Sequence, residues 1–130
     1  MKKIFLLASF VVAMSLNLFA QNDTVYYISF KESMGSWSID DKVKPEAVST
    51  IWQQTAQYGM KASAYVGGVK HVTESWFISA PLDLTSCTTL KMEFNQALNY
   101  ATPDYVSVKI TKDGVNWEKL NVPTMPEGKN

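Results

Sequence analysis

Apolar and polar residues alternate along two segments of the chain, which is the pattern of β-strands with one face in solvent. In residues 90–94, three apolar side chains alternate with a lysine and a glutamate. In residues 105–111, valine and isoleucine alternate with serine and lysine. Shorter runs rich in aromatic and β-branched residues predict further strands at residues 24–30, 37–39, 51–53, 61–66, 75–79 and 118–120. Only residues 45–50 offer a helical turn.

The spacing of these segments predicts an all-β fold. Successive strands are separated by roughly 8–15 residues, with Gly, Pro, Asn and Asp between them, which is typical of an antiparallel β-sandwich. The clearest connection is Asp113-Gly114, between residues 105–111 and 118–120. Glycine supplies the positive φ of a tight turn, so this sequence predicts a β-hairpin, with Trp117 packed over it.

The N-terminus has the pattern of a secretory signal peptide. Lys2 and Lys3 precede an apolar stretch that ends at Ala20, followed by polar residues. A spanning helix needs about 20 mostly apolar residues, and this stretch is shorter and interrupted by polar side chains. We expect residues 1–20 to be removed near Ala20, and the mature chain to be secreted, periplasmic or on the cell surface, without a membrane span.

The mature chain, residues 21–130, has the length of a single small domain. Without Lys2 and Lys3 it contains ten lysines against twelve acidic residues, a formal charge of −2, and it has no arginine. Nucleic-acid binding requires a basic face, and phosphate recognition favours the guanidinium group. Both functions are therefore disfavoured.

The sequence offers little for catalysis. His71 is the only histidine and lies in a connection between predicted strands, and no serine has a G-x-S-x-G context. Cys87 is the only cysteine, without an adjacent cation that would lower its pKa. Glu74 and Glu93 flank strand interiors, where solvent-facing positions are a simpler interpretation than a glycosidase pair. The protein is predicted not to be an enzyme.

Several stretches resemble the choice-of-anchor J family and its cleaved-adhesin and MAM-like relatives among bacterial secreted proteins. The matching residues lie between 29 and 117: Phe30 to Trp37, Trp52, Tyr58 to Tyr65, Thr73 to Ser79 with its Trp76-Phe77-Ile78-Ser79 core, Asp83-Leu84, Leu90, Phe94, Ala97 and Tyr100. The resemblance implies a jelly-roll (galactose-binding-like) sandwich, commonly attached to secreted peptidases, nucleases and adhesins.

The chain departs from this family at two places. Pro81 stands one position later than the usual proline, and relatives continue beyond residues 126–130 with one or two further strands. The last strands are therefore expected to be missing, either because the sequence is part of a longer protein or because the domain is short and leaves an edge for self-association.

The resemblance also implies a structural calcium ion, which jelly-roll relatives often hold. Calcium requires several oxygen ligands, and the weak candidates are Glu32, Asp40, Asp41 and Glu74. The EF-hand spacing is absent, so solvated loop charge remains the alternative for these four residues.

The aromatic residues provide the best candidates for ligand binding. Aromatic rings stack on the apolar faces of sugars, while nearby polar groups fix hydroxyls. Trp52, Tyr58 and Tyr100 lie near loops and are the predicted platform, with packing as the alternative for each. We therefore expect an exported, non-catalytic module for extracellular recognition or adhesion, with a glycan or protein as its partner. The alternatives are an accessory domain of a longer secreted peptidase or nuclease, and a structural unit that self-associates through a sheet edge.

Overall fold

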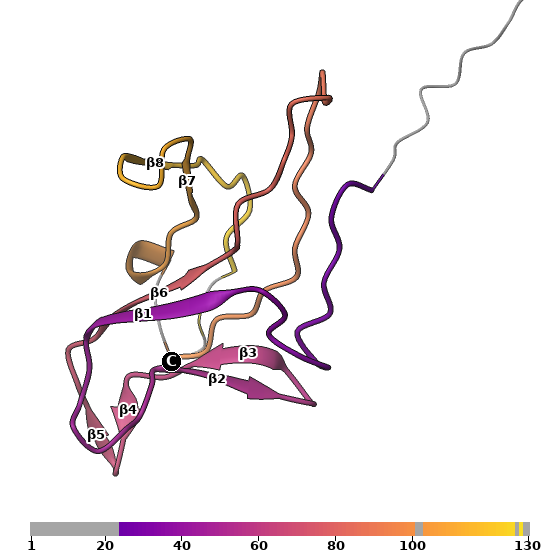
Figure 1. Ribbon diagram of the computed structural model, residues 1–130. Helices are drawn as coiled ribbons and strands as arrows, with labels where there is room; N and C mark the ends of the chain where they lie inside the picture. The colour runs from indigo at the N-terminus through magenta and orange to yellow at the C-terminus, as the bar shows by residue number, and fades with distance from the viewer. Residues whose placement is uncertain (1–23, 101–102, 127, 129–130) are drawn as a thin grey trace, which may run out of the picture. The chain divides into compact units, whose positions relative to one another are not determined.

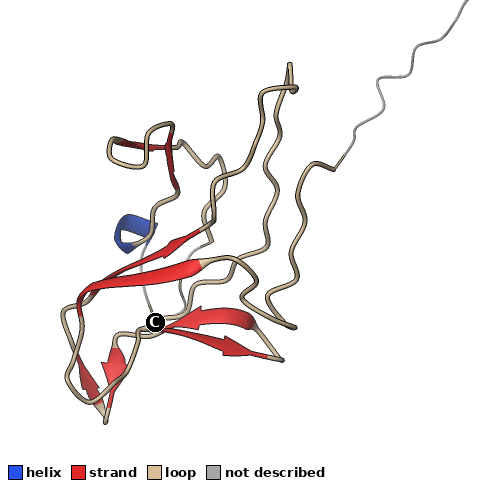
Figure 2. Ribbon diagram, viewed as in Figure 1, coloured by secondary structure: helices blue, strands red, loops and turns tan. Residues whose placement is uncertain are grey.

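The computed structural model describes residues 24–100, 103–126 and 128, and these residues form an all-β chain. Their regular structure consists of strands and one 3-10 turn, η1 (Figures 1 and 2). The elements are β1 (Ser38–Val43), β2 (Trp52–Thr55), β3 (Gly59–Ala62), β4 (Tyr65–Val66), β5 (Val69–Lys70), β6 (Glu74–Ile78), η1 (Pro103–Tyr105), β7 (Lys109–Thr111) and β8 (Trp117–Lys119).

The described strands pair as four two-stranded antiparallel ladders. Three of them, β2–β3, β4–β5 and β7–β8, are hairpins of consecutive strands. The fourth joins β1 to β6, which are separated along the chain by the first two hairpins. Each ladder therefore leaves an unpaired edge on both of its strands.

The chain divides into two compact units, Met1–Ser86 and Cys87–Asn130. The first unit contains β1 to β6, and the second contains η1, β7 and β8. The sequence-based assignment of residues 21–130 to one domain stays a prediction.

The β1–β6 ladder places side chains of different character on its two faces. Ile39 pairs with Phe77 and Asp41 with Ser75, so these four lie on one face. The intervening pair, Asp40 and Trp76, belongs to the other face. The register shifts between Asp41 and Val43, which ends the regular alternation at a bulge.

Phe77 is the centre of an aromatic cluster in the first unit. Its ring lies 4.7 Å from that of Trp37, 5.1 Å from Phe30 and 5.4 Å from Trp52, measured between centroids. Phe30 and Trp37 also meet edge to face at 5.1 Å. These separations are typical of stabilising aromatic pairs. Next to Trp52 in the chain, Ile51 is the only described hydrophobic residue that is buried, at 6% exposure.

Two connections depend on glycine. Gly67 and Gly68 have φ values of 59° and 84°, which allows the two-residue turn between β4 and β5. Gly59 begins β3 with a φ of 78°, and a Cβ atom there would lie 3.2 Å from Cβ of Phe30. A side chain at position 59 would therefore disturb the edge of the aromatic cluster.

The strand predictions differ in outcome. Residues 37–39, 51–53, 61–66 and 75–79 all overlap strands, and the Asp113-Gly114 hairpin is confirmed by the β7–β8 pairing. Residues 45–50, expected to offer a helical turn, form no helix but contain one turn, which the Val48 backbone N–H closes by donating to the Pro45 carbonyl oxygen at 3.3 Å.

Three predicted strands are wrong or shorter than expected. Residues 24–30 and 90–94 contain no strand, and the strand predicted at residues 105–111 begins only at Lys109 because Tyr105 closes η1. Leu90, Met92 and Phe94 are 56%, 58% and 44% exposed. Alternation determines which side chains share a face, whereas a strand also needs a hydrogen-bonded neighbour, which the alternating sequence does not specify.

Candidate functional site

Trp52 is part of the aromatic cluster and does not form an exposed platform. Its ring stacks on Phe77 with an interplanar angle of 29°, and the residue is half-buried. Its indole N–H is buried and has no hydrogen-bond partner among the described residues. The packing alternative therefore describes Trp52 better than ligand stacking.

The other two platform residues are exposed. Tyr58 is 66% exposed in the turn between β2 and β3, where its backbone N–H donates to the Thr55 hydroxyl at 3.1 Å. Tyr100 is 72% exposed and has a positive φ of 59°. Tyr58 belongs to the first unit and Tyr100 to the second. No single unit therefore contains the three predicted platform residues.

Exposure is a property of every tyrosine in the chain. All six are exposed, and the exposed fraction ranges from 39% at Tyr26 to 84% at Tyr105. The others are Tyr27, Tyr58, Tyr65 and Tyr100. The ring contacts of the cluster come instead from phenylalanine and tryptophan. The rings of the cluster thus come from phenylalanine and tryptophan, whereas every tyrosine is exposed, as is Phe94 outside the cluster.

Asp41 connects three parts of the first unit. Its carboxylate accepts hydrogen bonds from the Ser75 hydroxyl on β6 and from the backbone N–H of Ile51, the latter at 3.3 Å and 3.4 Å to its two oxygens. Desolvation by burial raises the pKa of Asp41. The hydrogen bonds from Ser75 and Ile51, together with the nearby Thr50 hydroxyl and Lys44 ammonium, lower it by more. The pKa of Asp41 therefore lies below 3.8. The Thr50 hydroxyl oxygen is buried and makes no hydrogen bond of ordinary geometry. Asp41 therefore has a structural role.

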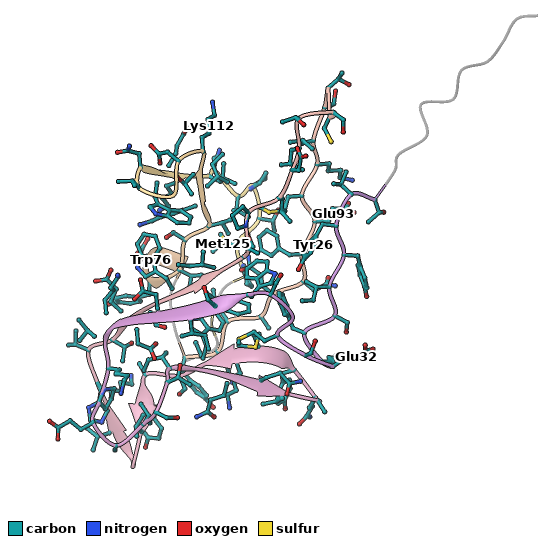
Figure 3. The ribbon with its side chains drawn as sticks, viewed as in Figure 1. Tyr26, Glu32, Trp76, Glu93, Lys112 and Met125 are labelled. Atoms are coloured by element: carbon teal, nitrogen blue, oxygen red, sulfur yellow. The ribbon has the colours of Figure 1, made fainter. Side chains whose placement is uncertain are left out.

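The remaining calcium candidates do not gather around Asp41. Asp40 forms an ion pair with Lys42 at 2.5 Å, and Glu74 accepts a hydrogen bond from the Trp76 indole N–H at 3.1 Å. Glu32 is exposed in a turn (Figure 3). Among the described residues, no group of three or more His, Cys, Asp or Glu side chains is placed to hold a metal ion. The four carboxylates are thus not brought together as a calcium site.

The two reactive side chains considered for catalysis are His71, which is exposed, and Cys87, which is half-buried. His71 is exposed, with its Nε2 3.4 Å from the Val66 carbonyl oxygen, and its backbone N–H donates to Ala64. Cys87 is a free, half-buried thiol. These contacts tie His71 to the base of the β4–β5 hairpin.

The β7–β8 turn is held by one carboxylate. Asp113 accepts hydrogen bonds from the Thr111 hydroxyl, the backbone N–H groups of Val115 and Asn116, and the Asn116 amide, at 2.6–2.9 Å. The bonds from Asn116, then Val115 and Thr111, lower the pKa of Asp113 far below its usual value. The Asp113 carboxylate is therefore ionised at neutral pH, although it is fully open to solvent.

Two hollows of about 370 Å³ lie in the second unit. The first is lined by Asp104, Val106, Ser107, Val108, Lys119, Leu120, Asn121, Val122 and Met125. The second lies at the β7–β8 hairpin, from which Lys112 projects (Figure 3), and is lined by Ile110, Thr111, Lys112, Asp113, Asn116, Trp117 and Glu118. Because Ile110 pairs with Glu118 and Thr111 with Trp117, the lining of the second hollow comes from both faces of the hairpin.

The sequence analysis assigned Trp117 to packing and did not include this hollow among the candidate sites. The local signal was present, because Asp113-Gly114 fixed the turn and placed Trp117 at the start of the return strand. What the sequence did not show is the register, which pairs Trp117 with Thr111 on one face of the hairpin and Glu118 with Ile110 on the other.

Within the described part of the chain, no helix has the length and apolar character needed to cross a membrane.

Comparisons of the chain with protein families, with curated proteins and with solved structures found no match. The similarity to choice-of-anchor J proteins therefore depends on the quoted sequence motifs alone.

Proposed function

We propose that this chain is an exported, non-catalytic β-rich module that recognises an extracellular glycan or protein. The observation that supports this proposal is the exposure of all six tyrosines, while the ring-to-ring contacts are made by phenylalanine and tryptophan. Tyrosine provides a large, rigid contact surface with a polar tip and loses little conformational entropy on binding. A surface rich in exposed tyrosine is suited to recognition.

Export and the finer fold assignment belong to the same proposal. Residues 1–20, the predicted signal peptide with cleavage near Ala20, lie outside the described residues, and the destination would be the periplasm, the cell surface or the medium. The antiparallel ladders are compatible with a jelly-roll sandwich of the choice-of-anchor J type. That assignment is supported by the Trp76-Phe77-Ile78-Ser79 motif, which coincides with the end of β6.

A glycan array tests the recognition proposal. The exported chain is compared with Tyr58→Ala and Tyr100→Ala, and at least one variant is expected to lose about thirtyfold in affinity, because hot-spot aromatics contribute about 2 kcal/mol or more. Val72→Ala is the control, since Val72 is 87% exposed and has no ring. A wild-type chain that binds no glycan would contradict glycan recognition and leave protein recognition to be tested.

A second candidate function, self-association, is favoured by the sheet edges. Each described ladder has only two strands, so every strand has an edge without a neighbouring strand, and such edges pair readily with another chain. Size-exclusion chromatography with light scattering at micromolar concentration is expected to show a dimer or larger species if this function holds. A monomer at every concentration up to about 100 μM would rule it out, because a specific dimer of useful affinity would form there.

A further inference from the structure

We propose that two copies of this chain associate through the segment centred on Met92, which pairs with itself as two antiparallel strands. This inference rests on the self-association proposed above and assigns it to one segment in one register. In that register, Met92 lies opposite Met92 of the second copy. Leu90 of each copy lies opposite Phe94 of the other, and Lys91 of each lies opposite Glu93 of the other.

The segment around Met92 is available for pairing with another strand. Residues 90–98 contain no turn or bend, and every residue from 88 to 95 is exposed. Within the described part of the chain, the backbone of residues 90–98 is hydrogen-bonded to no other backbone segment. A run of backbone N–H and C=O groups without such partners is a template for a strand from another chain. The strand pattern of residues 90–94 would then be realised between two copies.

The apolar side chains of the segment match each other in this register. Leu90, Met92 and Phe94 are 56%, 58% and 44% exposed. Side chains two positions apart share one face of an extended strand, so these three form an apolar row. The antiparallel pair places the apolar row of the second copy directly beside it, and directly opposed apolar side chains stabilise a strand pair.

The charged side chains select the antiparallel orientation. Lys91 and Glu93 lie on the same side of the segment, with Nζ 2.6 Å from Oε1, and their side chains are 80% and 75% exposed. Antiparallel pairing about Met92 places each lysine opposite a glutamate of the second copy. A parallel pair in the same register would place lysine opposite lysine and glutamate opposite glutamate, which is destabilising. The segment is therefore complementary to itself in charge as well as in apolar character.

This complementarity also indicates a closed dimer. The same residues of both copies meet about a two-fold axis at Met92, which is the arrangement of an isologous interface. The contact is small, so we expect a weak dimer with a dissociation constant of about 10–100 μM.

Analytical ultracentrifugation of the exported chain, at concentrations up to about 100 μM, tests this interface. Lys91→Glu and Glu93→Lys should each weaken the dimer about tenfold, because like charges then face each other at two places. An equal mixture of these two variants should form a heterodimer within about threefold of the wild-type affinity, since every opposed pair is again unlike. The mixture keeps the test independent of any general effect of either substitution alone.

Met92→Lys should weaken the dimer more than about tenfold, because two ammonium groups would meet at the two-fold axis. Val115→Lys is the matched control, since Val115 belongs to the same unit and is 78% exposed, and it should leave the affinity unchanged within about twofold. A dimer that all variants at positions 91–93 leave unchanged, or a mixture that stays monomeric, overturns this interface alone. A wild-type chain that is monomeric at every concentration overturns both this interface and self-association.

Discussion

The Phe77→Ala variant is expected to lose about 3 kcal/mol of unfolding free energy, which is a large fraction of the roughly 5–15 kcal/mol that stabilises a typical domain. Phe77 contacts the rings of Phe30, Trp37 and Trp52 at centroid distances of 4.7–5.4 Å. No other side chain of the cluster has three ring contacts. Because Ile51 is the only buried hydrophobic residue among those described, little other apolar burial compensates for the lost ring.

Urea unfolding followed by tryptophan fluorescence and near-UV circular dichroism measures this loss. Tyr58→Ala is the matched control: it also removes a ring, but from a residue that is 66% exposed, and should change stability by less than about 0.5 kcal/mol. Phe77→Leu should recover part of the loss, because it restores apolar volume without the edge-to-face geometry. Equal stabilities of Phe77→Ala and Tyr58→Ala would show that the aromatic cluster does not hold the first unit together.

The Asp41→Ala variant is expected to cost about 1–2 kcal/mol at pH 7, the usual size for hydrogen bonds to a charged group that is partly exposed. The substitution removes the acceptor of the Ser75 hydroxyl and of the Ile51 backbone N–H. Ile51 is buried, so its N–H would lose its partner where water has little access. Urea unfolding measures the change, and Asp40→Ala is the control because Asp40 lies on the opposite face and forms its ion pair with the exposed Lys42.

The effect of Asp41 should depend on pH in a defined direction. Its pKa is lower in the folded chain than the value of 3.8 expected when unfolded. The stabilisation is therefore present above pH 3.8 and is lost as the pH falls through the folded pKa. The difference in urea midpoint between wild type and Asp41→Asn should shrink between about pH 5 and pH 2. A difference that grows on acidification would contradict the structural role assigned to this carboxylate.

Local signals in the sequence predicted the elements that depend on neighbouring residues. The Asp113-Gly114 turn determines its own hairpin, because Asp113 bonds to groups within three positions and Gly114 supplies the positive φ. The strand character of residues 75–79 was equally clear from its aromatic and β-branched side chains, and β6 occupies Glu74–Ile78. These features need no information from distant parts of the chain.

Long-range pairing decided the environment of the remaining residues. Trp52 looked like a loop aromatic in the sequence, but the structure stacks it on Phe77, 25 positions away. Asp41 was a weak calcium candidate with solvated loop charge as the alternative, but it accepts hydrogen bonds from Ile51 and from Ser75, 34 positions away. Residues 90–94 have the alternation of a strand but form none. Alternation determines which side chains share a face, but it does not specify which other strand will pair with the segment. The sequence by itself thus determined the all-β character and the local turns, whereas only the tertiary structure decided which aromatic and acidic side chains are used for packing, since those contacts join distant segments.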